Sequence, residues 1–279
     1  MKKLSSIIAT AFLMFGFASC DVIEEPYKKD NNGGGEEPNP EVVVKHVLLE
    51  DYTGVNCSNC PIAGEIALDI QERYNHQVIV LGVHAGSMTS LPPTNPTYKD
   101  FTTPEGDQWW SYFNFQQNPT GTVNRKQING GYAYDYPSWD EAVAEALQEE
   151  AMLEMISEIE YDDATRNLKV DVKSKFLAEM PETYSLTVCI MEDSIVAAQN
   201  QQGHGVIPDY VHRHVFRTTM NDAWGEDINI EPIAPEDEIV RSYTTTLNEA
   251  YNADQCYIIA YVSNSNTKEI LQVIEKKIK

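Results

Sequence analysis

Two cysteines three positions apart, Cys57 and Cys60, are the residues of this chain whose types and spacing could do chemistry. They follow an apolar run at residues 42–49 and precede a helical pattern at residues 61–74. Two thiols at this spacing can close a small disulfide ring. At the start of a helix, unpaired N–H groups and the helix dipole favour a thiolate, so one cysteine can become nucleophilic near neutral pH. The pattern leaves two interpretations open, a redox centre and a disulfide that only staples the fold.

Asp51 is the residue that this chemistry would need to carry protons. It lies six positions before Cys57, and a buried carboxyl group without a cation beside it has a raised pKa and can act as a general base. Glu50 competes for the role, because only one of two adjacent strand residues faces the interior. The spacing resembles that of thioredoxin-like proteins and favours Asp51.

Pro119 gives the second support for a redox centre. Thioredoxin-like folds place a cis-proline against the disulfide and follow it with a strand. The segment Asn118-Pro119-Thr120, just before a strand pattern at residues 121–125, resembles this arrangement. A cis bond before proline costs only about 0.5–1 kcal/mol, so a fold can hold one. We therefore expect a cis peptide bond at Pro119.

The N-terminal residues predict export and attachment to a membrane. Residues 1–19 contain a short positive start, a mostly apolar stretch and two small residues directly before Cys20. This is typical of a bacterial lipoprotein signal peptide, with Cys20 as the lipidated residue. Residues 20–41 are rich in glycine, proline and charge, which predicts a tether that cannot bury enough surface to fold.

The charge of the chain excludes some partners. Lysine and arginine together number 20 and the acids number 43, a formal net charge of −23. Loss of the signal peptide removes two lysines and no acid, so the mature chain is more negative still. Such a charge argues against nucleic acid as a partner and against direct adhesion to anionic lipid.

Residues 42–156 are predicted to form an α/β domain. Apolar runs at residues 42–52 and 78–83 are typical of buried parallel strands, and residues 61–74 between them have the apolar spacing of a helix. The segment at residues 106–115 could form a short helix that packs its aromatic residues inward.

A longer helix is expected at residues 139–159. Ser138 stands in the N-cap position, and Glu141 follows three residues later, as in a capping box. The apolar residues from Trp139 to Leu153 would form its buried face.

From residue 157 to residue 279 the pattern of apolar and polar residues changes and predicts an all-β domain. Short alternating stretches separated by turn residues are typical of an antiparallel, immunoglobulin-like sandwich. A longer insertion at residues 197–227 interrupts them. Cys189 and Cys256 lie inside two of the strands, where they either form a bridge or remain two buried free thiols.

Four segments together resemble a family. Residues 48–54, 57–61, 119–125 and 210–224 resemble the outer-membrane protein twenty-eight family of Bacteroidota lipoproteins. The resemblance covers nearly all of the mature chain. It implies a thioredoxin-like N-terminal domain, a C-terminal β-sandwich and lipid anchoring at the outer membrane.

The cysteine segment also departs from ordinary thioredoxins. Asn56 stands where an aromatic residue is usual, and Pro61 where a basic residue is usual. No lysine or arginine lies between Tyr52 and Gln71, so thiolate stabilisation would depend on the helix N-terminus alone. This makes a strong oxidant less credible and a structural disulfide more credible.

No cofactor or metal is predicted. His84, His204, His212 and His214 suggest a metal site, but no carboxylate or cysteine completes a recognisable ligand spacing. His84 is expected to be a packed or hydrogen-bonded residue.

The sequence thus leaves two functions. The favoured one is a binding or accessory role at the cell envelope, for a protein held in the outer membrane through lipidated Cys20 and contacting envelope or surface proteins or peptides. The alternative is a thiol–disulfide oxidoreductase in which Cys57 attacks, Cys60 resolves, Asp51 moves the proton and Pro119 shapes the groove. Whether the protein faces the surface or the periplasm stays open.

Overall fold

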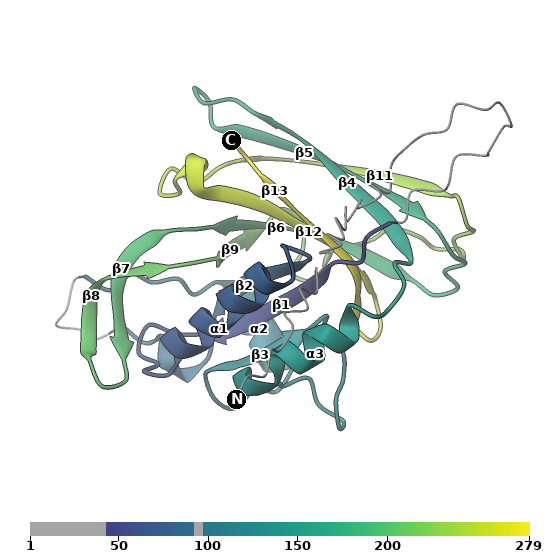
Figure 1. Ribbon diagram of the computed structural model, residues 1–279. Coiled ribbons are helices and arrows are strands. Elements are labelled where there is room, and N and C mark those ends of the chain that lie inside the picture. Colours follow the sequence, from purple (N-terminus) through teal and green to yellow (C-terminus); the bar gives the residue numbers. More distant parts are fainter. Residues whose placement is uncertain (1–42, 92–96) are drawn as a thin grey trace, which may run out of the picture. The chain divides into compact units, whose positions relative to one another are not determined.

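The computed structural model describes residues 43–91 and 97–279 (Figure 1). The predicted signal peptide, lipidated Cys20 and the tether lie outside these described residues. Within the described ranges, no helix has the length and apolarity needed to cross a membrane.

One mixed sheet forms the centre of the molecule. Its strands lie in the order β13-β12-β6-β9-β2-β1-β3, and β10 pairs with β6 at its side. They are β1 (Val47–Thr53), β2 (Val78–His84), β3 (Thr120–Val123), β6 (Tyr184–Glu192), β9 (Val215–Thr219), β10 (Glu226–Asp227), β12 (Cys256–Asn264) and β13 (Ile270–Lys277). The strands from the first part of the chain therefore continue into those from the last part.

The first part of this sheet is built around two parallel strands. β1 and β2 run parallel, with Asp51 opposite Gly82, and β3 runs antiparallel to β1. Both parallel strands are buried almost throughout, as the continuous apolar runs predict. The helix α1 (Cys60–Arg73) connects them.

Three α-helices cover the two faces of these strands. α1 and α3 (Trp139–Ala146) share a core with one face, whereas α2 (Pro104–Tyr112) packs on the other (Figure 1). α1 approaches the sheet through small residues, Ala63 and Ala67, while Ile62 is exposed. Trp109 of α2 is fully buried, as expected for an inward-facing aromatic residue. Three short 3₁₀ helices complete the helical set in the described residues: η1 (Ser87–Thr89), η2 (Tyr136–Ser138) and η3 (Ala253–Gln255).

A second, antiparallel sheet packs on the last part of the central sheet. It has the order β11-β5-β4 and consists of β4 (Leu153–Tyr161), β5 (Asn167–Phe176) and β11 (Glu238–Thr246). Its apolar face shares a core with β6, β12 and β13. The predominance of strands in this part confirms the all-β expectation, and two facing layers are what an alternating pattern requires.

The predicted helix at residues 139–159 is wrong beyond its first two turns. α3 ends at Ala146, and β4 begins at Leu153. In β4, Leu153, Met155 and Ser157 are buried while Glu154 and Ile156 are exposed, a period of two that only a strand satisfies. The capping box is also absent, because the Ser138 side chain makes no cap hydrogen bond.

The segment predicted as an insertion at residues 197–227 joins the two parts of the molecule. It contributes most of the hairpin β7 (Ile195–Gln201) and β8 (Gly205–His212), followed by β9. β9 pairs with β2 on one side and β6 on the other. One sheet thus crosses the predicted division at residue 156, and residues 42–279 form one compact unit.

Of the two alternatives for Cys189 and Cys256, the structure has the second, since both are buried free thiols. They lie on the paired strands β6 and β12, but Cys189 is opposite Ile259 and Cys256 is opposite Glu192. The side chains therefore point to opposite faces of the sheet, into two different cores.

Candidate functional site

The two cysteines form a disulfide at the start of α1, which both interpretations of their spacing allow. Their Sγ atoms are 2.04 Å apart and their Cα atoms 5.4 Å apart. Cys60 is the first residue of α1 and Pro61 the second, a place where proline costs no hydrogen bond. Both cysteines are only 3% exposed.

The turn before the disulfide is held by its own backbone. The Cys57 N–H donates to the carbonyl of Gly54 at 3.0 Å, and the Asn56 N–H donates to the carbonyl of Met88 at 2.9 Å. A Cβ atom on Gly54 would lie 2.4 Å from that Met88 oxygen. Glycine is therefore required here by the close approach of two backbones.

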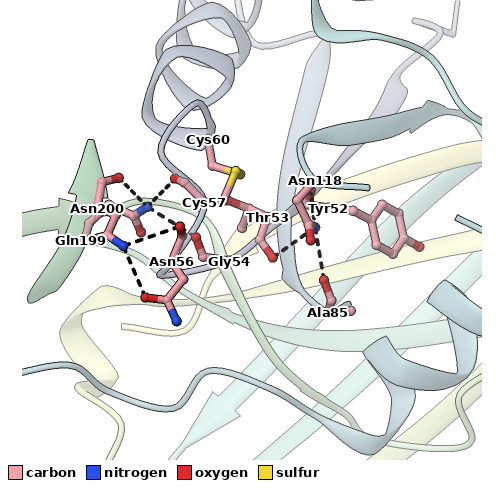
Figure 2. Close-up of a disulfide and its surroundings, with 10 residues drawn as sticks. All are labelled: Tyr52, Thr53, Gly54, Asn56, Cys57, Cys60, Ala85, Asn118, Gln199 and Asn200. Atoms are coloured by element: carbon pink, nitrogen blue, oxygen red, sulfur yellow. Dashed lines mark hydrogen bonds between the residues drawn. A yellow bond between two sulfur atoms is a disulfide. The ribbon is translucent and has the colours of Figure 1, made fainter. Parts of the chain in front are cut away.

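The hairpin β7–β8 covers the disulfide loop from the other side. The Gln199 amide donates to the carbonyl oxygens of Cys57 at 2.9 Å and Gly54 at 3.2 Å, as Figure 2 shows. The Asn200 N–H donates to the Val55 carbonyl. The hairpin thus adds hydrogen-bond donors to the buried carbonyl oxygens of the tight loop. Sequence reasoning missed these contacts, because the partners are more than 140 positions apart.

Pro119 has the expected cis peptide bond with Asn118. The Asn118 side chain donates to the carbonyl oxygens of Tyr52 and Ala85, each at 3.0 Å (Figure 2). These bonds tie the ends of β1 and β2 to the segment that leads into β3. The cis-proline is therefore fixed at the end of the sheet at which α1 begins.

Asp51 lies in a pocket together with Cys60. The side chain is 6% exposed, and its Oδ1 has no hydrogen-bond partner. Burial raises the pKa of this carboxyl group from 3.8 to about 7. An acid with such a pKa can either take or give a proton at neutral pH.

Glu50 faces the opposite side of the sheet. Its carboxylate accepts hydrogen bonds from Thr122 at 2.7 Å and from Arg125 at 2.9 and 2.6 Å. Burial by itself would lower the pKa of Arg125, but the Glu50 carboxylate raises it well above its ordinary value. The guanidinium also lies 4.6 Å from the ring of Trp109 and 5.1 Å from that of Tyr261. This buried pair ties β1 to the end of β3 and lies away from the cysteines.

The pocket has a volume of about 200 Å³ and is lined by β1, α1, β2, β7, β8 and the turn after β8. His84 and His212, two of the histidines that suggested a metal site, both line this pocket. The rings of His84 and His212 are 5.6 Å apart, and both lie 4.8 Å from Phe101. Burial lowers the pKa of His84 well below 6.5 and that of His212 to about 4.

The other two histidines differ in position. His214 also lines the pocket, and burial lowers its pKa to about 4. His204 is exposed in the turn between β7 and β8. Among the described residues, no group of three or more histidine, cysteine, aspartate or glutamate side chains has the placement to hold a metal ion.

Comparisons with known proteins identify one family and solved structures of similar general fold. The family model described as "Outer membrane protein Omp28" matches residues 106–279. Among solved structures, HBP35 of Porphyromonas gingivalis is 17% identical with a TM-score of 0.67, and the match covers 85% of this chain and 76% of that one. No curated protein sequence matches the chain.

Two further solved structures are similar. A protein from Agrobacterium tumefaciens is 9% identical with a TM-score of 0.52, covering 86% of this chain and 96% of its own. A domain of the outer membrane lipoprotein Omp28 from Porphyromonas gingivalis is 24% identical over 46% of this chain and 89% of that domain, with a TM-score of 0.34. At these identities, the structures with the higher TM-scores inform on the fold alone.

Proposed function

Because the chain belongs to the Omp28 family of outer membrane proteins, we propose that it exchanges disulfides with envelope proteins through Cys57 and Cys60. The family places the protein at the outer membrane. Lipidation of Cys20 would anchor it there, and residues 20–41 would hold the folded part away from the bilayer. The partners would be envelope or surface proteins or peptides that carry cysteine pairs.

The placement of Asp51 carries this proposal. A carboxyl group that is nearly fully buried, has a pKa of about 7 and lines the same pocket as Cys60 is costly to keep. A disulfide that only staples the fold has no use for it, whereas exchange needs a proton carrier beside the second cysteine. The sequence favoured a binding role, whereas the burial of Asp51 favours disulfide exchange.

The connectivity of the first part of the chain supports a thioredoxin-like domain at residues 42–156. The parallel strands β1 and β2 are joined by α1, the disulfide lies at the start of that helix, and the cis bond of Pro119 precedes the antiparallel strand β3. Residues 157–279 would then form the immunoglobulin-like sandwich, with β9 inserted into the first part.

The proposed exchange proceeds in two balanced steps. A thiolate of the partner attacks Sγ of Cys57, the bond between Cys57 and Cys60 breaks, and Cys60 leaves as a thiolate that takes a proton from Asp51. A second thiolate of the partner then attacks the partner sulfur that is bonded to Cys57. Cys57 leaves as a thiolate. The partner loses two electrons in forming its disulfide, and the cysteine pair gains them.

A binding or accessory role is the second candidate, and the hairpin β7–β8 favours it. Gln199 is 2% exposed and bonds to the loop, and both cysteines are 3% exposed. A partner must therefore displace part of the chain that covers the cysteines before it reaches Sγ of Cys57. In the binding role, the disulfide stabilises the surface on which α1 and the hairpin meet.

Trapping of mixed disulfides tests the proposal. In Cys60→Ser, Cys57 can attack a partner but nothing resolves the product, so envelope extracts should contain adducts that a reducing agent releases. The matched control is the double variant Cys57→Ser with Cys60→Ser, in which Cys189 and Cys256 are still present. Adducts of equal amount in both variants, or in neither, would refute exchange.

The reduction potential of the pair gives an independent measure. Structural disulfides have potentials below about −300 mV, and exchange partners have higher ones. We expect equilibration of the pair with glutathione or thioredoxin buffers to give a value above this limit. A value well below it, together with no trapped adduct, leaves the binding role.

A further inference from the structure

The pocket beside Asp51 contains three buried polar atoms without partners. They are Oδ1 of Asp51, Nδ1 of His84 and Nε2 of His212, and each side chain is at least 94% buried. Such groups are rarely left unpaired in a folded protein, because each costs about 1–3 kcal/mol. They come from β1, β2 and β8, so three separate elements present unsatisfied groups to one space.

The unpaired atoms are mainly acceptors. Backbone groups of Ala198 and Ala197 beside the His212 ring raise its pKa, as carbonyl oxygens that accept from a ring N–H do, and its Nε2 has no partner. Because burial lowers the pKa of His212 to about 4, the ring is neutral at neutral pH. In a neutral ring whose other nitrogen donates, Nε2 accepts. The ionised Asp51 carboxylate accepts as well, so an occupant must bring donors.

The charges around the pocket favour a cation. Glu65 is exposed at the mouth. Arg213 also lines the pocket, but its Nε donates to both carboxylate oxygens of Asp193 at 2.7 and 2.9 Å. Its charge is therefore already compensated, and the histidines in the pocket are neutral.

The start of α1 offers little to an anion. Pro61 has no N–H, and the N–H groups of Cys60, Ile62 and Ala63 are bonded to the carbonyls of the preceding loop. The usual reason for anion binding at a helix N-terminus, a set of free N–H groups, does not hold for these residues.

The walls of the pocket would accept an aliphatic chain. Ala67, Leu68, Val80 and Val211 line it. Gly82 is opposite Asp51 in the register of β1 and β2, so that no side chain fills the space beside the carboxyl group. The pocket thus combines an apolar passage with a cluster of acceptors.

We infer that this pocket binds a primary ammonium group on an aliphatic stem, as the side chain of a lysine in a partner peptide presents it. The three N–H donors of the ammonium group match the acceptors of Asp51 and His212 and the unpaired nitrogen of His84, while the stem lies against Leu68 and Val80. This inference goes beyond disulfide exchange, since binding needs no reaction at the cysteines and is measured on the oxidised protein.

Binding should depend on pH through Asp51. The pKa of this group is about 7, so the carboxylate is present above neutral pH and the affinity should fall about tenfold for each pH unit below 7. Tyr210 stays neutral, because burial and then the charges of Asp51 and Glu65 raise its pKa to about 12. The titratable and charged groups that face Asp51 across the pocket are Glu65 of α1, His84 of β2, Tyr210 and His212 of β8, and Arg213 and His214 of the following turn.

Calorimetric titration of the full oxidised chain with n-butylammonium chloride at pH 8.5 tests the inference. We expect saturable binding, and at least tenfold weaker binding of 1-butanol and of butyrate, which have the same number of carbon atoms without the cation. Equal binding of 1-butanol would show an apolar cavity only, and binding of butyrate would reverse the assigned charge. Absence of butylammonium binding would show that water alone satisfies the three atoms, and each of these results overturns the inference.

Two variants locate the binding. Asp51→Asn keeps the shape of the side chain and should weaken butylammonium binding at least tenfold and remove its pH dependence. Asp163→Asn, which changes an exposed carboxylate paired with Lys279, should leave both unchanged. A thermal melt of each variant checks that it is folded, and unweakened binding by folded Asp51→Asn refutes the site. Failure here leaves the exchange proposal untouched, because trapping of adducts is measured separately.

Discussion

Replacement of Asp51 by asparagine should change how the stability of the protein depends on pH. In the folded chain, burial raises the pKa of the carboxyl group from 3.8 to about 7. In the unfolded chain, the group regains its ordinary pKa. Between these values the folded protein holds a proton that the unfolded chain has lost, so the free energy of unfolding falls as pH rises.

The magnitude follows from the shift. A difference of about 3 pKa units at 1.36 kcal/mol each gives about 4 kcal/mol. This stability is fully present below pH 3.8 and is lost as pH rises through 7. His212 and His214 act in the opposite direction, because their pKa values of about 4 lie below the ordinary 6.5. The pH profile of the native protein alone would therefore hide the contribution of Asp51.

The assay is urea unfolding of the oxidised protein, followed by tryptophan fluorescence at several pH values between 4 and 8. The quantity to plot is the free energy of unfolding of the native chain minus that of Asp51→Asn, because the two histidine contributions cancel in it. We expect this difference to fall by about 4 kcal/mol between pH 4 and 8. Asp163→Asn, the exposed control, should give a difference that is flat to within about 1 kcal/mol.

A flat difference for Asp51→Asn would refute the reasoning. It would mean that the carboxyl group is ionised throughout this range in the folded protein, paired with a cation or open to water. Asp51 could then not exchange a proton with Cys60 at neutral pH, and both the proposed exchange and the pH dependence of ammonium binding would lose their basis.

Three further outcomes are expected. Gln199→Leu removes both side-chain bonds between the hairpin and the disulfide loop, so reduction by dithiothreitol, followed by thiol titration, should become several-fold faster; an unchanged rate would mean that the hairpin does not limit access. Arg125→Met leaves Glu50 buried without its cation and should lower the free energy of unfolding by about 3–5 kcal/mol, whereas the double variant with Glu50→Gln should recover part of this loss in the same urea assay. Gly54→Ala places a methyl group against a backbone oxygen at 2.4 Å and should lower the melting temperature by several degrees more than alanine at Gly131, where a Cβ atom would have no neighbour nearer than 4.0 Å.

Local features of the sequence predicted several structural features of the site. The spacing of Cys57 and Cys60 predicted a disulfide at a helix start, and Asn118-Pro119-Thr120 predicted a cis bond before a strand. The apolar runs of β1 and β2 predicted buried parallel strands. Each of these properties depends on residues that are close in the chain, so patterns of composition and period are sufficient to indicate them.

Local patterns predicted the wrong structure where the helical and the strand period both fitted the same residues. The segment after Ala146 continues the acidic and apolar composition of α3, and Leu153 fits the helical spacing as well as it fits a strand. This segment forms the strand β4 and pairs with β5. As a strand it buries Leu153 and Met155 in the core that residues of β5, β6 and β12 also form. A helix in this position would leave the edge of β5 without its partner.

Only the tertiary structure decided how the site is enclosed. β9 enters the sheet between β2 and β6, and the hairpin before it brings Gln199 onto the carbonyl of Cys57 and His212 into the pocket of Asp51. The contact of Gln199 joins residues more than 140 positions apart, and the free energy of such contacts comes from burial that no local window of the sequence records. The cysteine spacing thus determined that a disulfide could form, and the fold of the distant hairpin decided that it is buried beside an acid without a cation.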